Sequence, residues 1–177
     1  MSQRSRPNVL VTGTPGVGKT TMCELLAEEA GMKHINFGSI LLEGGFNAGY
    51  NAEFDTHDVT EENLADACDS IEAAMGEGGV ILDYASCDYF PERWFDLVVV
   101  LVAETNSLFP RLEARGYSKK KVTENMQAEI FQVVLQDAYE LYPNVRKETL
   151  TSNTVDEMQE NIASIQQMLQ EVGSAAK

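Results

Sequence analysis

A glycine-rich segment, from Gly13 to Thr20, constrains the fold of this chain more than any other feature. It reads G-T-P-G-V-G-K-T and matches the pattern G-x-x-x-x-G-K-[S/T]. Residues 8–12 form a mostly apolar run typical of a buried strand, and residues 20–31 are predicted to be helical. A strand, a glycine turn and a helix gather backbone N–H groups into one phosphate-binding concavity at a helix N-terminus. In this context the segment predicts a nucleoside triphosphate site rather than a glycine turn with a chance lysine.

The motif also assigns tasks to individual side chains. Lys19 is expected to reach the β- and γ-phosphates, and the Thr20 hydroxyl is expected to bind Mg²⁺. Contacts to ATP are predicted along the whole segment, through Gly13, Pro15, Gly16, Val17, Gly18, Lys19, Thr20 and Thr21. The predicted cofactor is therefore Mg²⁺, bound together with the nucleotide.

Apolar runs and helix-like stretches alternate along the rest of the chain. Further strands are predicted at residues 33–36, 79–83, 96–102 and 145–150. Helices are predicted at 61–76, 105–115, 119–141 and from 152 or 153 to 173, with 37–58 irregular apart from a short helix near 39–43. Strands separated by helices predict a three-layer α/β fold, with a parallel sheet of about five strands and helices on both faces. The length of 177 residues fits one domain over residues 1–177.

Composition argues against several other classes of protein. Cys23, Cys68 and Cys87 are far apart and odd in number, which disfavours a disulfide framework or a zinc site and favours an intracellular protein. The first residues lack the apolar core of a signal peptide, and no apolar run approaches the ~20 residues that span a bilayer. A net charge of −15 disfavours extended nucleic-acid binding, which needs a basic surface. The one basic run, residues 119–121, is interpreted as a solvated helix start.

The apolar run Val80-Ile-Leu-Asp83 is interpreted as the second half of the nucleotide site. In P-loop proteins an acidic residue at the end of a neighbouring strand holds Mg²⁺ directly or through water, and Asp83 is predicted to do so here. Tyr84 follows Asp83, so the adjacent catalytic acid of mechanical ATPases is missing, and the guanine-specific N-K-x-D motif is absent. Small-molecule kinases and switch-type ATPases remain as candidate classes.

Three arginines are candidates for binding the transferred phosphoryl group and its acceptor. No Lys or Arg occurs from residue 34 to residue 92, so Arg93 is expected at the mouth of the sheet, near the acceptor phosphate. Arg111 and Arg115 stand four residues apart on one predicted helical face. Both are expected to point toward the nucleotide and to stabilise charge during transfer. Their position also suits the C-terminus of a helix, where cations are stabilising.

Several segments together resemble the adenylate kinase isoenzyme 6 family, the coilin-interacting nuclear ATPase group. They are Gly13–Thr21, Asp83-Tyr84, Cys87-Asp-Tyr-Phe-Pro-Glu-Arg-Trp94, Arg111–Tyr117 and Glu129-Ile-Phe-Gln-Val133. The resemblance spans nearly the whole chain, and the F-P-E-R-W segment is quite specific. It implies a nucleoside-monophosphate (NMP) kinase fold, with an NMP-binding part at about residues 36–59 and a short lid at about 114–124.

The resemblance also implies roles for single residues. Ser152 and Asn153 would lie in the loop beside the adenine of ATP. The NMP would contact Gly38, Asp83 and Arg93.

Two positions depart from the pattern of the family. Ala85 stands where members usually carry His, and Leu41-Leu42 stands where they tend to carry Arg. The second departure leaves Arg93, helped by His57, as the residue expected to hold the acceptor phosphate.

We therefore expect an ATP- and Mg²⁺-dependent adenylate kinase that makes two ADP from ATP and AMP, or uses another NMP, with accompanying ATPase activity. The alternative is an ATPase switch whose bound partner matters more than its product. The resemblance implies a role in 18S rRNA and small-subunit maturation in the nucleus and cytoplasm, with a basic ribosomal protein that suits the acidic surface. A scaffold without turnover is disfavoured by the intact Lys19, Thr20, Asp83, Arg93 and Arg115.

Overall fold

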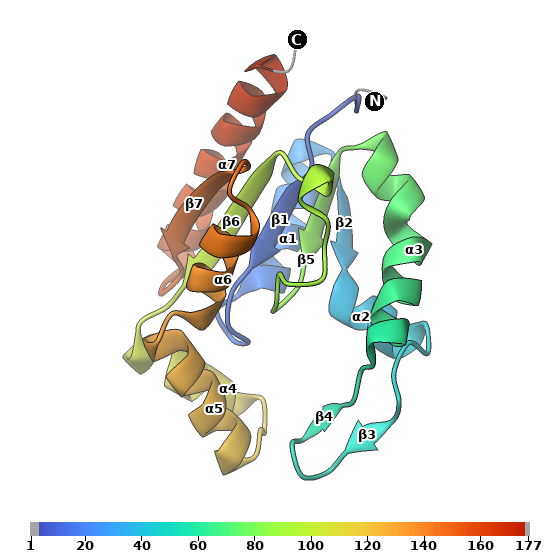
Figure 1. Cartoon of the computed structure of the whole chain (residues 1–177). Coiled ribbons are helices and arrows are strands. Elements are labelled where there is room, and N and C mark those ends of the chain that lie inside the picture. The colour runs from blue at the N-terminus through green and yellow to red at the C-terminus, as the bar shows by residue number, and fades with distance from the viewer. Residues whose placement is uncertain (1–3, 176–177) are drawn as a thin grey trace.

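A five-stranded parallel sheet forms the centre of the molecule (Figure 1). The computed structural model describes residues 4–175. Across the sheet the strands follow the order β2, β5, β1, β6, β7, and every neighbouring pair is parallel. Their bounds are β1 Val9–Thr12, β2 Lys33–Asn36, β5 Val80–Asp83, β6 Leu97–Val102 and β7 Arg146–Thr151. The predicted α/β fold class, with about five parallel strands, is confirmed.

Helices cover both faces of this sheet, as predicted. Their bounds are α1 Lys19–Ala30, α2 Phe37–Glu43, α3 Glu61–Glu77, α4 Thr105–Ala114, α5 Lys119–Ile130, α6 Val133–Leu141 and α7 Val155–Ala175, with a 3₁₀ turn η1 at Glu92–Trp94. The local sequence explains several helix ends. Helix α1 starts after Gly18 and stops at Gly31, both in the left-handed conformation, and Thr60 and Asn63 form a capping box at the start of α3.

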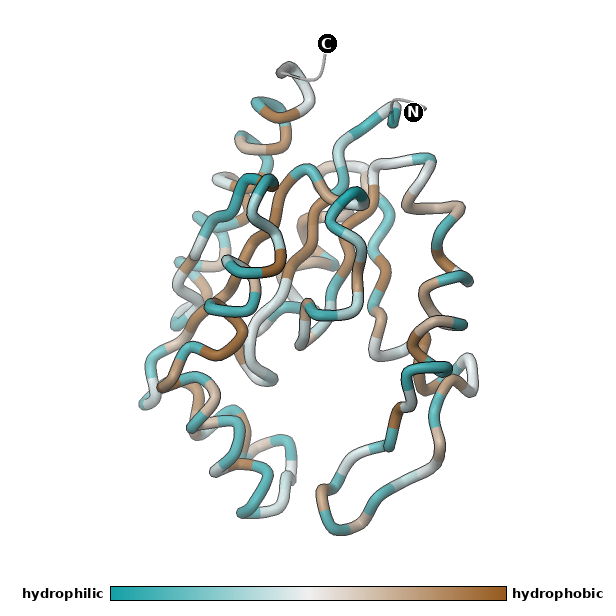
Figure 2. Tube along the Cα trace, in the orientation of Figure 1, coloured by the Kyte–Doolittle hydropathy of each residue, from teal (hydrophilic) through white to brown (hydrophobic). Residues whose placement is uncertain are grey.

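The core has two layers because successive side chains of a strand point to opposite faces of the sheet. In β6, Val98 and Val100 belong to the layer beneath α3 and α6, whereas Leu97, Val99 and Leu101 belong to the layer beneath α1, α4 and α7. Hydrophobic residues are concentrated along the central strands (Figure 2). Burial on both faces explains why β6 is an unbroken apolar run in the sequence.

The predicted helix over residues 119–141 is interrupted in the structure. Helix α5 ends at Ile130 and α6 begins at Val133, and between them Gln132 has a φ of 52°. The Gln132 N–H donates to the carbonyl of Glu129 at 3.0 Å, which closes the end of α5. A non-glycine residue seldom adopts this left-handed conformation, so the helical periodicity on either side gave no indication of the break.

Residues 37–59 are more ordered than expected. Besides α2 they hold an antiparallel hairpin of β3 (Tyr50–Asn51) and β4 (Thr56–His57). The Tyr50 hydroxyl donates to the Asp55 carboxylate at 2.8 Å across this hairpin. Strands of two residues carry no alternating pattern, so the sequence could not predict them. The hairpin projects beyond the carboxyl ends of the strands, facing the region where α4 meets α5 (Figure 1).

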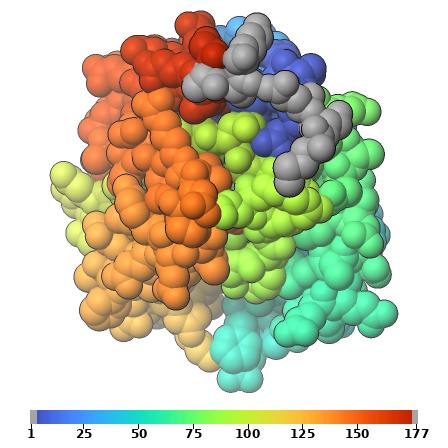
Figure 3. All heavy atoms as spheres, turned by 45° about the horizontal axis from the view of Figure 1, so that its top comes forward, coloured from blue at the N-terminus to red at the C-terminus, as the bar shows by residue number. Residues whose placement is uncertain are grey.

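The described ends of the chain lie together at the other end of the sheet (Figures 1 and 3). Gly173 of α7 packs next to Pro7, and Arg6 donates to the carbonyls of Ala30 and Gly31 at 2.7 and 2.6 Å. This arrangement leaves the carboxyl ends of the strands open to a ligand. Within residues 4–175, no helix has the length and apolar character needed to cross a bilayer.

Candidate active site

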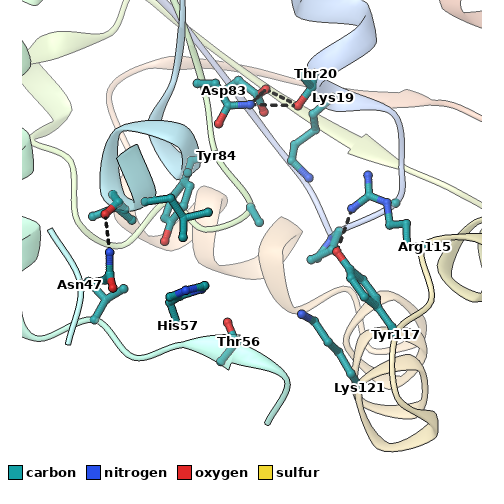
Figure 4. A pocket seen from close by; sticks show the side chains of 18 of the residues that line it. Lys19, Thr20, Asn47, Thr56, His57, Asp83, Tyr84, Arg115, Tyr117 and Lys121 are labelled. Carbon is teal, nitrogen blue, oxygen red and sulfur yellow. Dashed lines mark hydrogen bonds between the residues drawn. The ribbon is translucent and has the colours of Figure 1, made fainter. Parts of the chain in front are cut away.

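A cavity of about 360 Å³ lies at the carboxyl ends of β1, β2 and β5 (Figure 4). One side, called here the P-loop half, is lined by the glycine-rich loop, Asp83 and Arg115. The other side, the hairpin half, is lined by Asn36, α2, residues 47–59, Tyr84 and Ala85. The α4–α5 corner (residues 114–124) adds Tyr117 and Lys121. Ligand sites of open α/β sheets usually lie at this edge.

The glycines of the loop are required by its close packing. Gly13 has a φ of 148°, and a Cβ there would lie only 2.4 Å from the carbonyl oxygen of Leu101 in β6. Gly16 has a φ of 94°, and a Cβ there would lie 2.9 Å from Leu108 of α4. The loop is therefore pressed onto β6 and α4, so its conformation is set by backbone and core contacts before any ligand binds.

Lys19 lies in the centre of the loop, and its ammonium group is buried. It donates to the carbonyl of Gly13 at 2.6 Å and to that of Thr14 at 3.1 Å. Burial lowers the pKa of Lys19 to about 8; Asp83 opposes this shift and the Arg115 guanidinium adds to it. A buried cation whose partners are neutral carbonyls is well placed for the oxygens of a phosphate.

Thr20 and Asp83 place side-chain oxygens, the kind of ligand that a magnesium ion prefers, on the cavity wall. The Thr20 hydroxyl donates to Oδ2 of Asp83 at 2.7 Å, so these two groups are adjacent on the cavity wall. The Asn36 carboxamide donates to the same carboxylate oxygen at 3.3 Å and to the Thr20 hydroxyl at 3.2 Å. Hydroxyl and carboxylate oxygens beside a phosphate site fit Mg²⁺, which takes few protein ligands and keeps its waters and substrate oxygens.

Cations of the α4–α5 corner point into the cavity (Figure 4). Arg115 donates to the Tyr117 hydroxyl at 3.1 Å. Lys121 lies 4.0 Å above the centre of the Tyr117 ring and donates to the carbonyl of Asp55 at 2.5 Å. Tyr117 thus separates Arg115, on the side of Lys19, from Lys121, on the side of the hairpin. Both positive groups reach the cavity from the same short segment.

The corner also touches the tip of the hairpin. The Ser118 N–H donates to the Asp55 carboxylate at 3.3 Å, and Lys120 forms an ion pair with Glu53 at 3.5 Å. Lys120 also lies 4.1 Å above the ring of Phe54. These exposed contacts bridge the two sides of the cavity mouth. The corner and the tip of the hairpin are therefore in direct contact.

The hairpin half of the cavity is neutral. Its lining within residues 4–175 consists of apolar and uncharged polar side chains apart from His57, as expected from the stretch without Lys or Arg. Leu42 is 51% exposed and lines this wall. An anion in this half would meet no cation supplied by the wall itself.

Arg93 does not lie where we expected it. Its guanidinium pairs with Glu72 of α3 at 2.7 Å, and its carbonyl accepts from Arg4 at 2.6 Å. The chain leaves the carboxyl end of β5 and runs back across the sheet, so η1 lies at the amino end of β6, about 20 Å from the loop. Phe90 and Trp94 are buried along this crossing. The assignment of Arg93 to the acceptor phosphate is wrong. Arg93 is close to Asp83 in sequence, but it lies at the amino end of β6, whereas the cavity lies at the carboxyl ends of the strands.

Arg111 does not line the cavity either. Its guanidinium donates to the carbonyls of Ser152 and Asn153 at 2.8 and 2.7 Å. The Ser152 hydroxyl in turn donates to the carbonyl of Val17 at 2.6 Å, and the Asn153 side chain accepts from the Glu104 N–H at 2.8 Å. The expectation that Arg111 points at the transferred group is not met, because its N–H groups are directed at this loop. Contact of Ser152 and Asn153 with the adenine stays a prediction.

Glu129 is a buried carboxylate for which the sequence predicted no role, although it begins one of the segments that carry the family resemblance. It accepts from the Thr14 hydroxyl at 2.5 Å and from the Ala103 N–H at 2.6 Å. It therefore fastens the end of α5 to the P-loop and to the end of β6. Nothing in the local pattern distinguishes Glu129 from Glu124, the exposed acid of the same helix.

Of the other residues predicted to form the site, some line the cavity and some do not. Pro15, Gly16, Gly18, Lys19, Thr20, Gly38, His57, Asp83 and Arg115 all line it. Gly13, Val17 and Thr21 belong to the loop or to α1 without lining it. The lining residues that the sequence analysis did not single out include Asn36, Asn47, Tyr117 and Lys121.

Known proteins share both the sequence and the fold. Residues 9–132 match the model of a family described as an AAA domain. The chain is 41% identical over 162 residues to the adenylate kinase isoenzyme 6 homolog of Caenorhabditis elegans, covering 92% of this chain and 88% of that protein. It is 40% identical over 166 residues to the homolog FAP7 of Saccharomyces cerevisiae, covering 93% and 82%.

A solved structure supports the same fold at low sequence identity. Shikimate kinase from Bacteroides thetaiotaomicron superposes with a TM-score of 0.62 at 15% identity, covering 94% of this chain and 99% of the other. With the loop, the adjacent acid and the sheet order described above, these comparisons assign the chain: it belongs to the adenylate kinase isoenzyme 6 family and has the fold of P-loop kinases.

Proposed function

We propose that this protein transfers the γ-phosphoryl group of ATP to AMP or another NMP, and that it also hydrolyses ATP. In the transfer an oxygen of the acceptor phosphate forms a bond to the γ-phosphorus, the bond from that phosphorus to the bridging oxygen breaks, and ADP leaves. The observation that carries the proposal is the continuity of the cavity. A phosphate-binding loop and a metal-site acid form one side, and the hairpin half leaves room for a second substrate opposite Lys19.

The P-loop half would hold ATP. Lys19 and the loop N–H groups bind the β- and γ-phosphates, and Arg115 reaches the transferred group from the corner. Thr20 and Asp83 would hold Mg²⁺, which neutralises charge on the phosphate oxygens when bound. The protein positions the reactants in line and stabilises charge, so no covalent intermediate is needed.

The acceptor would occupy the hairpin half, within the NMP-binding part at 36–59, and residues 114–124 would act as the lid. With Arg93 at the other end of the sheet, we assign the acceptor phosphate to Lys121, with His57 beside it. Figure 4 shows both side chains at the cavity, approaching from opposite sides. Because Lys121 belongs to the corner, acceptor binding and lid closure become one event.

A second candidate function is an ATPase switch that acts on a bound protein. The neutral wall of the hairpin half favours it, since a water nucleophile needs no anion clamp. The net charge of −15 suits a basic partner such as a small-subunit ribosomal protein. A role in 18S rRNA maturation, in the nucleus and cytoplasm, would follow from this function.

Product analysis with and without acceptor separates the two functions. Purified protein with ATP and Mg²⁺ is assayed for ADP and for inorganic phosphate, alone and with each NMP. A kinase forms ADP in excess of phosphate when AMP is added. Phosphate release that no NMP changes, but that a basic ribosomal protein accelerates, would favour the switch and contradict the kinase.

A further inference from the structure

A thiol, an imidazole and a carboxylate meet beside the cavity, and the proposed transfer uses only the carboxylate. One ligand atom each from Cys23, His34 and Asp83 lies within 4.8 Å of the other two. Nε2 of His34 is 3.4 Å from Oδ2 of Asp83. Cys23 and Asp83 are buried, while His34 is partly exposed.

The fold brings these groups together from three elements. Strands β2 and β5 pair with His34 opposite Ile81 and with Asn36 opposite Asp83, so all four side chains point to the same face of the sheet. Helix α1 packs on that face, and Cys23 follows Thr20 by one helical turn. Since the Thr20 hydroxyl contacts Asp83, the thiol one turn later is directed at the same carboxylate.

The donor set differs in kind from the one that suits magnesium. Mg²⁺ prefers oxygen ligands, whereas thiolate and imidazole ligands favour zinc-class ions. One sulfur, one nitrogen and one oxygen make three of the four positions of a tetrahedral site, which leaves the fourth for a water. In the sequence, the wide spacing of the three cysteines argued against a zinc site. Spacing patterns detect only metal ligands that are close in sequence, whereas Cys23, His34 and Asp83 are far apart in the chain.

We propose that Cys23, His34 and Asp83 form a binding site for a soft divalent cation of the zinc class, and that occupation of this site inhibits nucleotide turnover. On binding, the S–H bond of Cys23 breaks, a sulfur–metal bond forms and the proton passes to solvent. The cation enters by the cavity, where Asp83 is part of the wall. It inhibits because it takes the carboxylate that would otherwise serve Mg²⁺.

Cadmium alone, without nucleotide, is the direct probe because a cadmium–thiolate bond has its own ultraviolet charge-transfer band. Titration of the whole protein with Cd²⁺ should develop this band until one ion is bound per chain. Cys23→Ala should remove it, and His34→Gln should weaken Cd²⁺ binding by at least about tenfold, because even the outer-shell partners of metal ligands contribute roughly 10–100-fold. Thermal unfolding of each variant shows whether it is folded, and Cys23→Ser serves if the alanine variant is not.

The other two cysteines supply matched controls. Cys68 lies on α3 and contacts the carbonyl of Tyr89, and Cys87 lies in the crossing after β5. Cys68→Ala should keep the full band and the one-to-one end point. A band that survives in Cys23→Ala, or that is lost in Cys68→Ala, would overturn the site, whatever reaction the protein catalyses.

Inhibition is tested separately, with phosphate release from ATP at fixed Mg²⁺ and rising Zn²⁺. Zn²⁺ should inhibit wild type and Cys68→Ala at the same concentration. The Zn²⁺ concentration that inhibits Cys23→Ala to the same extent should be at least about tenfold higher. Equal inhibition of Cys23→Ala and wild type would overturn the inhibitory role.

Discussion

The two halves of the cavity are built in different ways. In the P-loop half, glycine conformations and core contacts shape a backbone cradle around a buried lysine. In the hairpin half, short elements present a neutral wall, and the nearest cation, Lys121, comes from the corner across the mouth. For the proposed transfer, this difference predicts that the triphosphate meets a preformed site, whereas an acceptor phosphate is held only while corner and hairpin are together.

The largest expected effect is at the centre of the P-loop half. Lys19→Ala removes the one side-chain cation within the loop and should lower both ADP formation and phosphate release by on the order of 10³–10⁵. Circular dichroism and thermal unfolding check that the variant is folded. A folded Lys19→Ala protein with full activity would contradict the assignment of this half to the triphosphate.

Arg115→Ala tests whether the corner serves the transferred group. Its guanidinium is exposed and reaches the cavity from the proposed lid, so it should act on the transition state more than on bound ATP. The expected loss in kcat is roughly 10²–10⁴ with a modest change in KM for ATP.

A matched control for Arg115 is Arg146→Ala; Arg146 lies on β7, and its exposed side chain pairs with Glu171 of α7. This variant should behave as wild type. A raised KM for ATP with normal kcat in Arg115→Ala would reassign Arg115 to ground-state binding.

Lys121→Gln tests the assignment in the hairpin half. Loss of a charge-assisted bond of ~1.5–3 kcal/mol should raise KM for AMP by roughly one to two orders of magnitude, while hydrolysis of ATP alone changes little. Lys119→Gln removes the same charge two residues away, outside the cavity lining, and is the control.

Arg93→Ala completes this comparison. It should leave KM for AMP within about twofold of wild type, because its exposed pair with Glu72 is worth little. A large rise of KM in Arg93→Ala, together with none in Lys121→Gln, would restore the original assignment.

The pH dependence of turnover tests the burial of Lys19 in the P-loop half. The pKa of Lys19 is lowered to about 8 by burial, so its ammonium group is present below that pH and is lost above it. Since kcat/KM reports groups of the uncomplexed enzyme, kcat/KM for ATP should fall about tenfold for each pH unit above this pKa. A kcat/KM that stays constant to the usual pKa of lysine would show that Lys19 is not perturbed.

The P-loop half was predictable because most of the residues that form it are consecutive in the sequence. Gly13 to Thr20 specify the loop, and the strand ending at Asp83 lies next to β1, as the family pattern requires. Apolar runs also predicted β1, β5 and β6, because strands buried on both faces leave a continuous signature.

The hairpin half was not predictable in the same way. Its strands have two residues each, its loop is held by side-chain contacts such as Tyr50 to Asp55, and Lys121 was interpreted as part of a solvated run. The prediction for Arg93 failed because its proximity to Asp83 in sequence was taken for proximity in space. Glu129 and His34 contact partners that are distant in the chain, which no local pattern records.

The most direct test of the account is the binding of a bisubstrate analogue in which two adenosines are joined through five phosphates. Calorimetry in the presence of Mg²⁺ would compare it with a non-hydrolysable ATP analogue, in wild type and in Lys121→Gln. We expect one molecule of the bisubstrate analogue bound per chain, tighter than the ATP analogue, and a loss of affinity of about 10–100-fold in Lys121→Gln for the bisubstrate analogue alone. A bisubstrate analogue that binds no tighter than the ATP analogue, or a loss shared equally by both ligands, would contradict the two-half cavity.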